Sequence, residues 1–352
     1  MSDGISQRKR DHLDLCAEEA VEFSTKTTLF DQVDLVHDAL PELALGDIAL
    51  ETTLLGKRLR APLLITGMTG GTDEAAQINQ DLARVAEDCG IAFGLGSQRA
   101  MLRSPDLSYT FEVRAQAPTT LVLANLGVVQ ATSMPTAAVD ALVRAVAADA
   151  LCIHLNPAQE LVQPGGDRDF RGGLETVRRL ATDLRVPVVV KETGCGISRA
   201  VARRLVDAGI RTVDVSGAGG TSWVRVETLR AGEPAATLGR EFAEWGIPTA
   251  AAVLAVRDLG LDCIASGGLR SGLDVAKAVA LGARVAGVAL PVLRAHREGG
   301  AEGARRVVER VLAGLRMAML LTGARDLDAL RRAPVVLGDS LRAWATVGDG
   351  NE

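Results

Sequence analysis

Short apolar runs recur along most of the chain and alternate with stretches that have helical spacing. The apolar runs occupy residues 61–67, 90–96, 121–126, 148–155, 186–190, 212–215, 262–265 and 284–289. They are rich in Val, Ile, Leu and Ala, and their lack of polar alternation is typical of strands that are covered on both faces. Helical spacing is found between them at 73–89, 137–147, 173–184, 198–208, 250–259 and 272–280.

Eight strands separated by crossover helices predict a (β/α)8 TIM barrel. A doubly wound open sheet is the alternative, but it would have to place eight strands and usually has a glycine-rich turn after the first. We expect a single domain over 1–352, with an N-terminal arm and leader at 1–60, barrel strands at 61–290, and C-terminal helices and a tail at 291–352. Residues 221–247 are too long for a simple connection after strand 6, so we expect a lid-like insertion there.

Composition argues against several classes of partner. The formal net charge is −5 with three Trp and one Tyr, whereas single-strand nucleic-acid binders need basic grooves and stacking aromatics. No signal-peptide pattern follows the N-terminal charges, and Lys277 and Arg284 interrupt the apolar stretch at 276–293, so no membrane span is expected. Five scattered cysteines without a C-x-x-C pair fit a reducing compartment, and we expect a cytoplasmic protein.

The residues after each strand carry the candidate chemistry, because all strand ends of a parallel barrel face the same side. The glycine-rich segments at 216–221 and 266–268 expose consecutive backbone N–H groups, and 268–271 leads into a helix N-terminus, which favours an anion. Glycine turns are often only turns, but two at neighbouring strand ends indicate a phosphate-bearing ligand. Lys191 adds a cation at another strand end, either for such a ligand or for a structural salt bridge.

A second polar cluster follows the fourth strand, at 154–160. His154, Asn156, Gln159 and Glu160 combine an imidazole, two amides and a carboxylate, a set that can hold Mg²⁺ through the carboxylate and offer neutral donors to a second group. The alternative is that these polar residues only cap the strand and form a turn. Nearby cations would come from Arg99 and from the basic run at 8–10, which is otherwise a solvated, mobile chain end.

These motifs resemble those of the type 2 isopentenyl diphosphate isomerases, FMN-dependent enzymes of isoprenoid biosynthesis. The resemblance rests on R-K-x-x-H at 8–12, M-T-G-G at 68–71, G-S-Q-R at 96–99, H-L-N-x-x-Q-E at 154–160, G-D-R-x-F at 166–170, V-K-E at 190–192, D-V-S-G-x-G-G-T-S-W at 214–223 and S-G-G-x-R at 266–270. The last motif is shared by many FMN barrels, whereas the Q-E pair and the T-S-W run are specific. In order, the motifs span nearly the whole chain.

The resemblance implies a barrel that uses reduced FMN and Mg²⁺ to interconvert isopentenyl and dimethylallyl diphosphate, with NADPH as reductant and with the reduced flavin as proton donor and acceptor. It implies FMN contacts at Thr66, Gly67, Met68, Thr69, Ser97, Asn125, Lys191, Ser216, Thr221, Gly267, Gly268, Leu269, Ala289 and Leu290. It implies substrate contacts at Arg8, Lys9, Ser97, Gln98, Arg99, His154, Asn156 and Gln159, catalytic roles for Gln159 and His154, and the metal at Glu160. The family is usually oligomeric, so a homo-oligomer is expected.

One position departs from the family pattern. Where Pro-Glu-Gly-Asp-Arg is expected, the chain has P-G-G-D-R at 164–168. The missing carboxylate at Gly165 could loosen this loop or alter metal affinity, which leaves Glu160 as the expected ligand.

Two other functions remain as alternatives. An FMN-dependent oxidoreductase of the 2-hydroxy-acid oxidase type would use a His base and an Arg clamp late in the barrel, but His296 and Arg297 lie beyond the eighth strand and outside such an arrangement. A non-catalytic phosphate-binding barrel would have no use for Gln159 or for a metal at Glu160.

Overall fold

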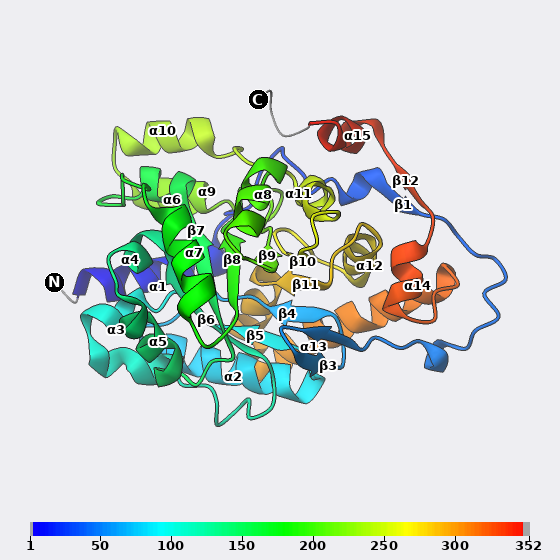
Figure 1. Cartoon of the computed structure of the whole chain (residues 1–352), viewed down its shortest axis with the longest axis horizontal. Helices are drawn as coiled ribbons and strands as arrows, with labels where there is room; N and C mark the ends of the chain where they lie inside the picture. Colours follow the sequence, from blue (N-terminus) through cyan, green and yellow to red (C-terminus); the bar gives the residue numbers. More distant parts are fainter. Residues whose placement is uncertain (1–2, 348–352) are drawn as a thin grey trace.

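A closed barrel of eight parallel strands forms the centre of the computed structural model, which describes residues 3–347 (Figure 1). The strands are β4 (Leu63–Ile65), β5 (Ala92–Gly94), β6 (Val122–Gly127), β7 (Ala150–Leu155), β8 (Val188–Glu192), β9 (Thr212–Asp214), β10 (Asp262–Ala265) and β11 (Val285–Val288). Pairing of β11 with β4 closes the barrel. The predicted fold is confirmed, and most strands are shorter than the apolar runs that predicted them.

Helices cover the outside of the barrel, mostly where the spacing predicts them. They are α2 (Asp73–Cys89), α5 (Thr136–Ala145), α7 (Gly173–Asp183), α8 (Arg199–Asp207), α11 (Thr249–Val256) and α12 (Gly272–Ala280). α2 shows how local chemistry sets the bounds: the Thr72 side chain accepts a hydrogen bond from Ala75 N, and Gly90 ends the helix in the left-handed region at φ 65°. Shorter helical segments are α3 (Arg99–Arg103), η3 (Pro105–Phe111), α4 (Val128–Thr132) and α6 (Pro157–Val162).

The amino-terminal end of the barrel is plugged by a hairpin from the leader. β2 (Thr52–Leu54) pairs antiparallel with β3 (Lys57–Leu59). Leu54 and Leu59 are buried in one cluster with inward-facing residues of the barrel strands. A fully buried leucine contributes about 1.5–3 kcal/mol, so the plug stabilises the barrel and leaves only the opposite end open to ligands.

The chain ends pack on the barrel and on each other. α1 (Asp3–Glu18) is a helix where the sequence suggested an arm or a mobile end. The leader continues through η1 (Phe30–Gln32), β1 (Val33–Leu35) and η2 (Leu45–Asp47), and β1 pairs antiparallel with β12 (Val335–Leu337). The remaining C-terminal helices are α13 (Leu290–Leu321), broken at Gly299 and Gly300, α14 (Leu327–Arg332) and α15 (Asp339–Ala345). The tail at 348–352 lies outside the described residues.

The insertion at 221–247 forms two helices, α9 (Trp223–Arg230) and α10 (Ala235–Phe242). α9 begins after Ser222, whose side chain accepts a hydrogen bond from Arg225 N at 3.2 Å. This start directs Trp223 into the cavity at the open end of the barrel. Within residues 3–347, none of the helices combines the length and the apolar character needed to cross a membrane.

Candidate active site

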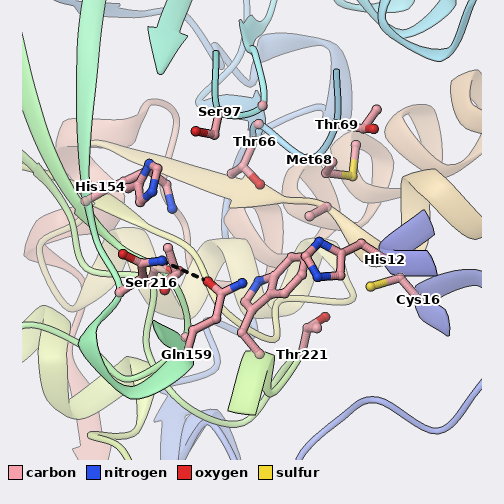
Figure 2. Close-up of a pocket in the computed structure, with 18 of the residues that line it drawn as sticks. His12, Cys16, Thr66, Met68, Thr69, Ser97, His154, Gln159, Ser216 and Thr221 are labelled. Atoms are coloured by element: carbon pink, nitrogen blue, oxygen red, sulfur yellow. Dashed lines mark hydrogen bonds between the residues drawn. The ribbon is translucent and has the colours of Figure 1, made fainter. Parts of the chain in front are cut away.

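A cavity opens at the carboxyl ends of the barrel strands, between α1 and the insertion (Figure 2). The predicted site residues that line it are Arg8, Lys9, Thr66, Gly67, Met68, Thr69, Ser97, Arg99, Asn125, His154, Asn156, Gln159, Glu160, Lys191, Ser216, Thr221, Gly267, Gly268, Leu269, Ala289 and Leu290. They come from all eight strand ends and from α1. The barrel therefore brings together in space the residues that the motifs distribute over nearly 300 positions.

Gln98 is the one predicted site residue that does not line the cavity. Its side chain is buried: Oε1 accepts a hydrogen bond from Asn125 N at 3.0 Å, and Nε2 donates to Leu142 O at 3.4 Å. These bonds hold the loop after β5 against β6. Gln98 thus supports the position of Asn125, and its geometry gives no basis for a substrate contact.

Three cations from distant parts of the chain meet at the mouth of the cavity. Arg8 and Lys9 come from α1, and Arg99 begins α3. Burial and then the charges of Arg8 and Arg99 lower the pKa of Lys9 to about 8. Burial and the charge of Arg99 also lower the pKa of Arg8, whose Nε is a buried donor without a partner among residues 3–347. An anion placed among these side chains would relieve both the repulsion and the missing hydrogen bond.

His154 is neutral in the absence of a ligand. Burial, followed by the charges of Lys191, Lys9 and Arg99, lowers its pKa to about 3. Its Nδ1 lies 2.8 Å from Asn125 Oδ1, so the ring donates this proton to the amide oxygen and leaves Nε2 as an acceptor. A nearby anion would oppose the three cations and raise this pKa. In the ligand-free protein His154 is therefore an uncharged hydrogen-bonding group and not an imidazolium cation.

The amide of Gln159 is held between two neighbours. Asn156 Nδ2 donates to Gln159 Oε1 at 3.1 Å, and Gln159 Nε2 donates to Glu227 Oε1 at 3.3 Å. These opposite partners fix which end of the amide carries the oxygen. Figure 2 shows Gln159 across the cavity from Ser97 and Thr66. The side chain is thus oriented towards a ligand that would lie between the two sides.

Glu227 is a site residue that sequence reasoning missed. It is fully buried on α9, and Oε1 lies 2.8 Å from His12 Nε2 while Oε2 accepts a hydrogen bond from Arg230 at 2.7 Å. Burial would raise the pKa of Glu227, but His12 and Arg230 outweigh it and lower the pKa. The ionised carboxylate therefore ties α1 to the insertion and orients Gln159.

Glu160 is buried and already surrounded by hydrogen-bond donors. Its Oε1 accepts from Asn156 Nδ2 at 3.1 Å, and Oε2 accepts from Gln163 Nε2 at 3.3 Å and Asp167 N at 2.8 Å. Arg99 lies 3.8 Å away. Within residues 3–347, no group of three or more His, Cys, Asp or Glu side chains is arranged to hold a metal. Since Mg²⁺ commonly binds one or two carboxylates plus substrate oxygens, this site fits the ion only together with an anionic ligand.

Gly165 lies in the turn that follows α6. Its φ is +66°, in the left-handed region that favours glycine, and a Cβ there would meet no atom within 4 Å. The carboxylate of Glu160 accepts a hydrogen bond from the backbone N–H of Asp167, which lies two residues after Gly165. The departure from the family pattern therefore leaves the hydrogen bonds of Glu160 in place, and a longer side chain at Gly165 would point into open space.

The glycine-rich loops after β9 and β10 are packed more closely than the sequence suggested. A Cβ at Gly219 would collide with the backbone of Thr27 and Thr28, and a Cβ at Gly268 would collide with the Thr28 methyl group. Gly219 and Gly268 also have φ of +108° and +82°. Gly219 and Gly268 are thus needed partly because the leader packs against them on the side away from the cavity. Gly267 and Gly268 also line the cavity.

The floor of the cavity offers polar groups to a ligand, one of them a buried hydroxyl without a partner in the part of the chain that the structure describes. Thr69 Oγ1 is a buried hydroxyl that has no hydrogen-bond partner among the described residues. Lys191 Nζ donates to the backbone carbonyl of Glu192 at 2.5 Å and lines the cavity, and among residues 3–347 it does not form the salt bridge considered as its alternative. Asp214, beside it on β9, accepts from Ser266 Oγ at 2.5 Å, and burial raises the pKa of Asp214. The polar groups present fit FMN.

Several further lining residues were not assigned to the site from the sequence, although His12, Trp223 and Arg270 stand in its motifs. They are His12, Leu13, Cys16, Gly96, Gln130, Gln163, Thr193, Gly194, Trp223, Ser266, Arg270, Gly287 and Leu293. The spacing of Arg8, His12 and Cys16 places them on one face of a helix, and this spacing was the available signal for α1. His12 packs edge-on against Trp223 with ring centroids 5.1 Å apart, which closes the cavity between α1 and α9.

Comparison with known proteins assigns the family. Residues 1–104 and 112–337 match the model of the FMN-dependent dehydrogenase family. The isopentenyl-diphosphate delta-isomerase of Stutzerimonas stutzeri is 48% identical over 336 residues, covering 94% of this chain and 96% of that protein. The enzyme of the same name from Methanothrix thermoacetophila is 46% identical over 336 residues, covering 94% and 93%.

A solved structure described as a lactate oxidase from Pediococcus acidilactici shares the fold. Its TM-score is 0.68 at 17% identity, covering 96% of this chain and 94% of that one. This likeness supports the barrel alone, whereas the sequence relatives carry the closer assignment. The chain belongs to the isopentenyl-diphosphate delta-isomerases, within the FMN-dependent family of barrels.

Proposed function

We propose that this protein interconverts isopentenyl diphosphate and dimethylallyl diphosphate by a 1,3-allylic proton shift, with FMN in its reduced form, Mg²⁺, and NADPH as the reductant. The observation that carries the proposal is the meeting of Arg8, Lys9 and Arg99 beside the oriented amide of Gln159. The cations match a diphosphate, and the neutral amide matches an uncharged hydrocarbon group next to it.

The diphosphate would be held at the mouth of the cavity. Arg8, Lys9 and Arg99 supply charge, and Asn156 and His154 supply polar contacts. Arg offers a planar fork to phosphate oxygens, whereas Lys acts as a point charge. Ser97 lines the cavity between this region and the floor, so it stays a candidate for both substrate and FMN.

FMN would be held by the strand ends on the other side. The residues proposed to contact it are Thr66, Gly67, Met68, Thr69, Asn125, Lys191, Ser216, Thr221, Gly267, Gly268, Leu269, Ala289 and Leu290. Bound FMN, when reduced, would supply the acid–base chemistry that a 1,3-proton shift requires next to the substrate.

The residues of the chain itself orient the substrate and exclude water. The buried carboxylates nearest Gln159 are Glu160 and Glu227, and both are engaged by several donors. Gln159 therefore acts as an orienting catalytic residue against the hydrocarbon, with its own amide set by Asn156 and Glu227. His154 contributes an imidazole ring beside the diphosphate. Trp223 and the α1 residue His12 close the cavity against solvent.

Mg²⁺ would bind to Glu160 and to oxygens of the diphosphate. The carboxylate is buried next to Arg99, and a divalent ion there would add charge to the same anion-binding region. Two further parts of the proposal rest on the sequence. A homo-oligomer follows from the family resemblance, and a cytoplasmic location follows from the cysteine pattern.

The oxidase alternative finds no support in the geometry. His296 Nε2 is paired with Asp81 at 3.0 Å, and Arg297 is paired with Asp14 at 2.6 Å. Neither residue lines the cavity. The relatives described above are also named as isomerases.

The test is an isomerase assay on the purified protein with FMN, NADPH and Mg²⁺. Conversion of isopentenyl diphosphate to its allylic isomer, followed by proton NMR, should proceed with NADPH consumption far below the amount of product. Consumption of one NADPH per product would favour an oxidoreductase instead. No conversion, with FMN bound and reduced, would contradict the proposal.

A further inference from the structure

A leader segment crosses the loops at one end of the cavity. We call residues 19–28, between α1 and η1, the strap. Phe23 N donates to Gly220 O at 2.9 Å, and Ser222 N donates to Val21 O at 2.9 Å. These bonds place Glu22 opposite Thr221 in an antiparallel bridge. The backbone of the strap therefore holds the loop that presents Thr221 to the cavity.

The side chain of Glu22 reaches the next loop. Its Oε1 accepts a hydrogen bond from Arg270, which follows β10 and lines the cavity, and Oε2 accepts from Arg294 Nη1 at 3.2 Å. Arg294, on α13, also donates to the carbonyls of Cys16 at 3.1 Å and Glu19 at 2.9 Å. Glu22 thus lies between two ligand-facing loops: its neighbours Val21 and Phe23 bond the loop of Thr221, and its own carboxylate binds Arg270.

We propose that Glu22 is a positioning residue for the phosphate group of FMN, acting by holding the guanidinium of Arg270 towards the cavity. The inference rests on the proposed FMN site and assigns its phosphate to the loops after β9 and β10. Both loops line the cavity, through Thr221 and through Gly267 and Gly268, and Arg270 adds beside them the planar cation that suits a phosphate group.

Glu22 would act mainly by fixing the orientation of the Arg270 guanidinium and less by its own charge. Arg270 is about one-third exposed, so without a partner its long side chain would sample many rotamers, and ordering it on binding costs free energy. A carboxylate bound to one edge of the guanidinium leaves the remaining donors of the fork for the ligand. The carboxylate of Glu22 is shared between the guanidiniums of Arg270 and Arg294, so it does not by itself neutralise both.

The strap has other attachments that do not involve the Glu22 side chain. Glu244, at the end of the insertion, accepts hydrogen bonds from Ser24 N and Lys26 N, each at 2.8 Å. Arg225 donates to the carbonyl of Glu22 at 2.9 Å. Removing the carboxylate of Glu22 should therefore free Arg270 while the strap stays in place.

The test is to titrate the full-length apoprotein with FMN and, separately, with riboflavin, which lacks the phosphate. For Glu22→Ala we expect the FMN dissociation constant to rise about five- to tenfold, as for one weakened charge-assisted contact, and the riboflavin constant to change less than about twofold. Glu22→Gln keeps an acceptor for Arg270 but loses the charge, so we expect a smaller rise in the FMN constant, about twofold. The control is Glu19→Ala, which removes an exposed carboxylate from the same strap.

The outcomes separate the possible roles. A loss confined to FMN supports the positioning role. Equal weakening of FMN and riboflavin would mean that Glu22 only supports the fold, tighter FMN binding would mean that it competes with the phosphate, and an unchanged FMN constant would mean no role; each overturns the inference. Should Glu22→Ala fail to fold, the ratio of the FMN and riboflavin constants of Glu22→Gln, compared with that of the unsubstituted protein, decides between these outcomes. If the unsubstituted protein binds neither ligand, it is the proposed function that fails.

Discussion

The two ends of the cavity are built in opposite ways. At one end, formed by the loops after β9 and β10, the backbone packs against the strap and the charges of Arg270 and Arg294 are paired with Glu22. At the mouth end, formed by α1, α3 and the end of β7, Lys9 is buried among cations, and the nearest carboxylates to Arg99 are 3.8 Å away. The cations at the first end are paired with a carboxylate of the protein. The mouth end has buried cations that lack such a close partner among residues 3–347.

The difference indicates which kind of ligand each end would hold. A preformed site loses little free energy in ordering itself, as suits a resident cofactor. Buried like charges cost free energy that only an anion can recover, as suits a substrate that must bind and leave. The comparison therefore predicts that substitutions at the mouth end change substrate parameters while FMN stays bound.

The largest effect is expected at Gln159, where the mouth end meets the proposed reaction centre. Gln159→Leu should lower kcat about 100- to 1,000-fold, because losing one oriented polar group at a reacting centre typically has that effect. KM should change less than about threefold, since the cations are untouched. Steady-state isomerase kinetics measure both.

The FMN absorbance of Gln159→Leu serves as its control and should match that of the unsubstituted protein. A variant that loses FMN would place Gln159 in the cofactor site. A kcat within about threefold of the original would remove it from the chemistry.

Lys9→Met should weaken substrate binding and at the same time stabilise the apoprotein. We expect KM for isopentenyl diphosphate to rise about 10- to 100-fold, as for a lost charged contact. The apoprotein should become more stable by about 1–3 kcal/mol, because the substitution removes a buried cation that other cations repel. Urea denaturation without ligands measures the second quantity.

Arg10→Met is the matched control for Lys9→Met, since Arg10 lies on the same helix but is exposed. It should change neither KM by more than about twofold nor the unfolding free energy by more than about 0.5 kcal/mol. Equal effects of the two substitutions would show that overall charge, and not the buried position, matters at the mouth end.

Glu160→Gln tests the metal at the boundary between the two ends. The Mg²⁺ concentration for half-maximal activity should rise about tenfold, because the carboxylate is the one proposed protein ligand and an amide is a weaker donor to this ion. FMN affinity should stay unchanged. An unaltered Mg²⁺ response would exclude Glu160 as the ligand, and a parallel loss of FMN would mean that its hydrogen bonds support the whole cavity.

The pKa of His154 makes the mouth end sensitive to acid. The folded pKa of about 3 lies below the ordinary value of 6.5, so between these pH values the unfolded chain binds the additional proton. The free energy of unfolding should therefore fall as the pH decreases from 6.5 towards 3, by up to about 1.4 kcal/mol per pH unit from this group. Above pH 6.5 the group contributes no slope.

Urea titrations of the apoprotein at several pH values measure this slope. His154→Asn should make it shallower, and inorganic pyrophosphate should do the same for the unsubstituted protein by opposing Lys191, Lys9 and Arg99. An identical slope in the variant would show that other groups dominate acid unfolding.

The smallest effect is expected at Gly165. Restoring the family residue with Gly165→Glu should destabilise the protein by about 1 kcal/mol, because the left-handed φ of +66° disfavours a side chain. Activity and Mg²⁺ dependence should change less than about twofold, since the added side chain points to open space. A large gain in Mg²⁺ affinity would show that the carboxylate reaches the metal after all.

Local patterns in the sequence were sufficient to predict the barrel and much of the cavity. Apolar runs without alternation predicted the eight strands, and barrel geometry then placed every strand end on one side. The mouth-end cations and the 154–160 cluster followed from this placement and from the family motifs. Gln98 is the exception: its motif position is right, but a strand-end turn directs its side chain into the protein.

The position of helix α1 and the burial of Glu227 depend on contacts between residues far apart in the sequence. α1 is polar, and it is fixed by ion pairs such as Asp11 with Arg230 and Asp14 with Arg297, more than 200 residues away. Glu227 lies in an insertion whose burial depends on α1 covering it. The close packing of Gly219 and Gly268 against Thr28 was equally hidden, because a glycine-rich segment looks the same whether a ligand or another part of the chain approaches it.

The strap also has a consequence for biosynthesis of the protein. Residues 19–28 leave the ribosome early, but Glu22 and Arg270 are 248 positions apart, and β1 pairs with β12 near the end of the chain. Contacts of such large sequence separation form late. A nascent or truncated chain that ends before Arg270 lacks one wall of the flavin cavity, so stable loading of the cofactor should await synthesis of nearly the whole polypeptide.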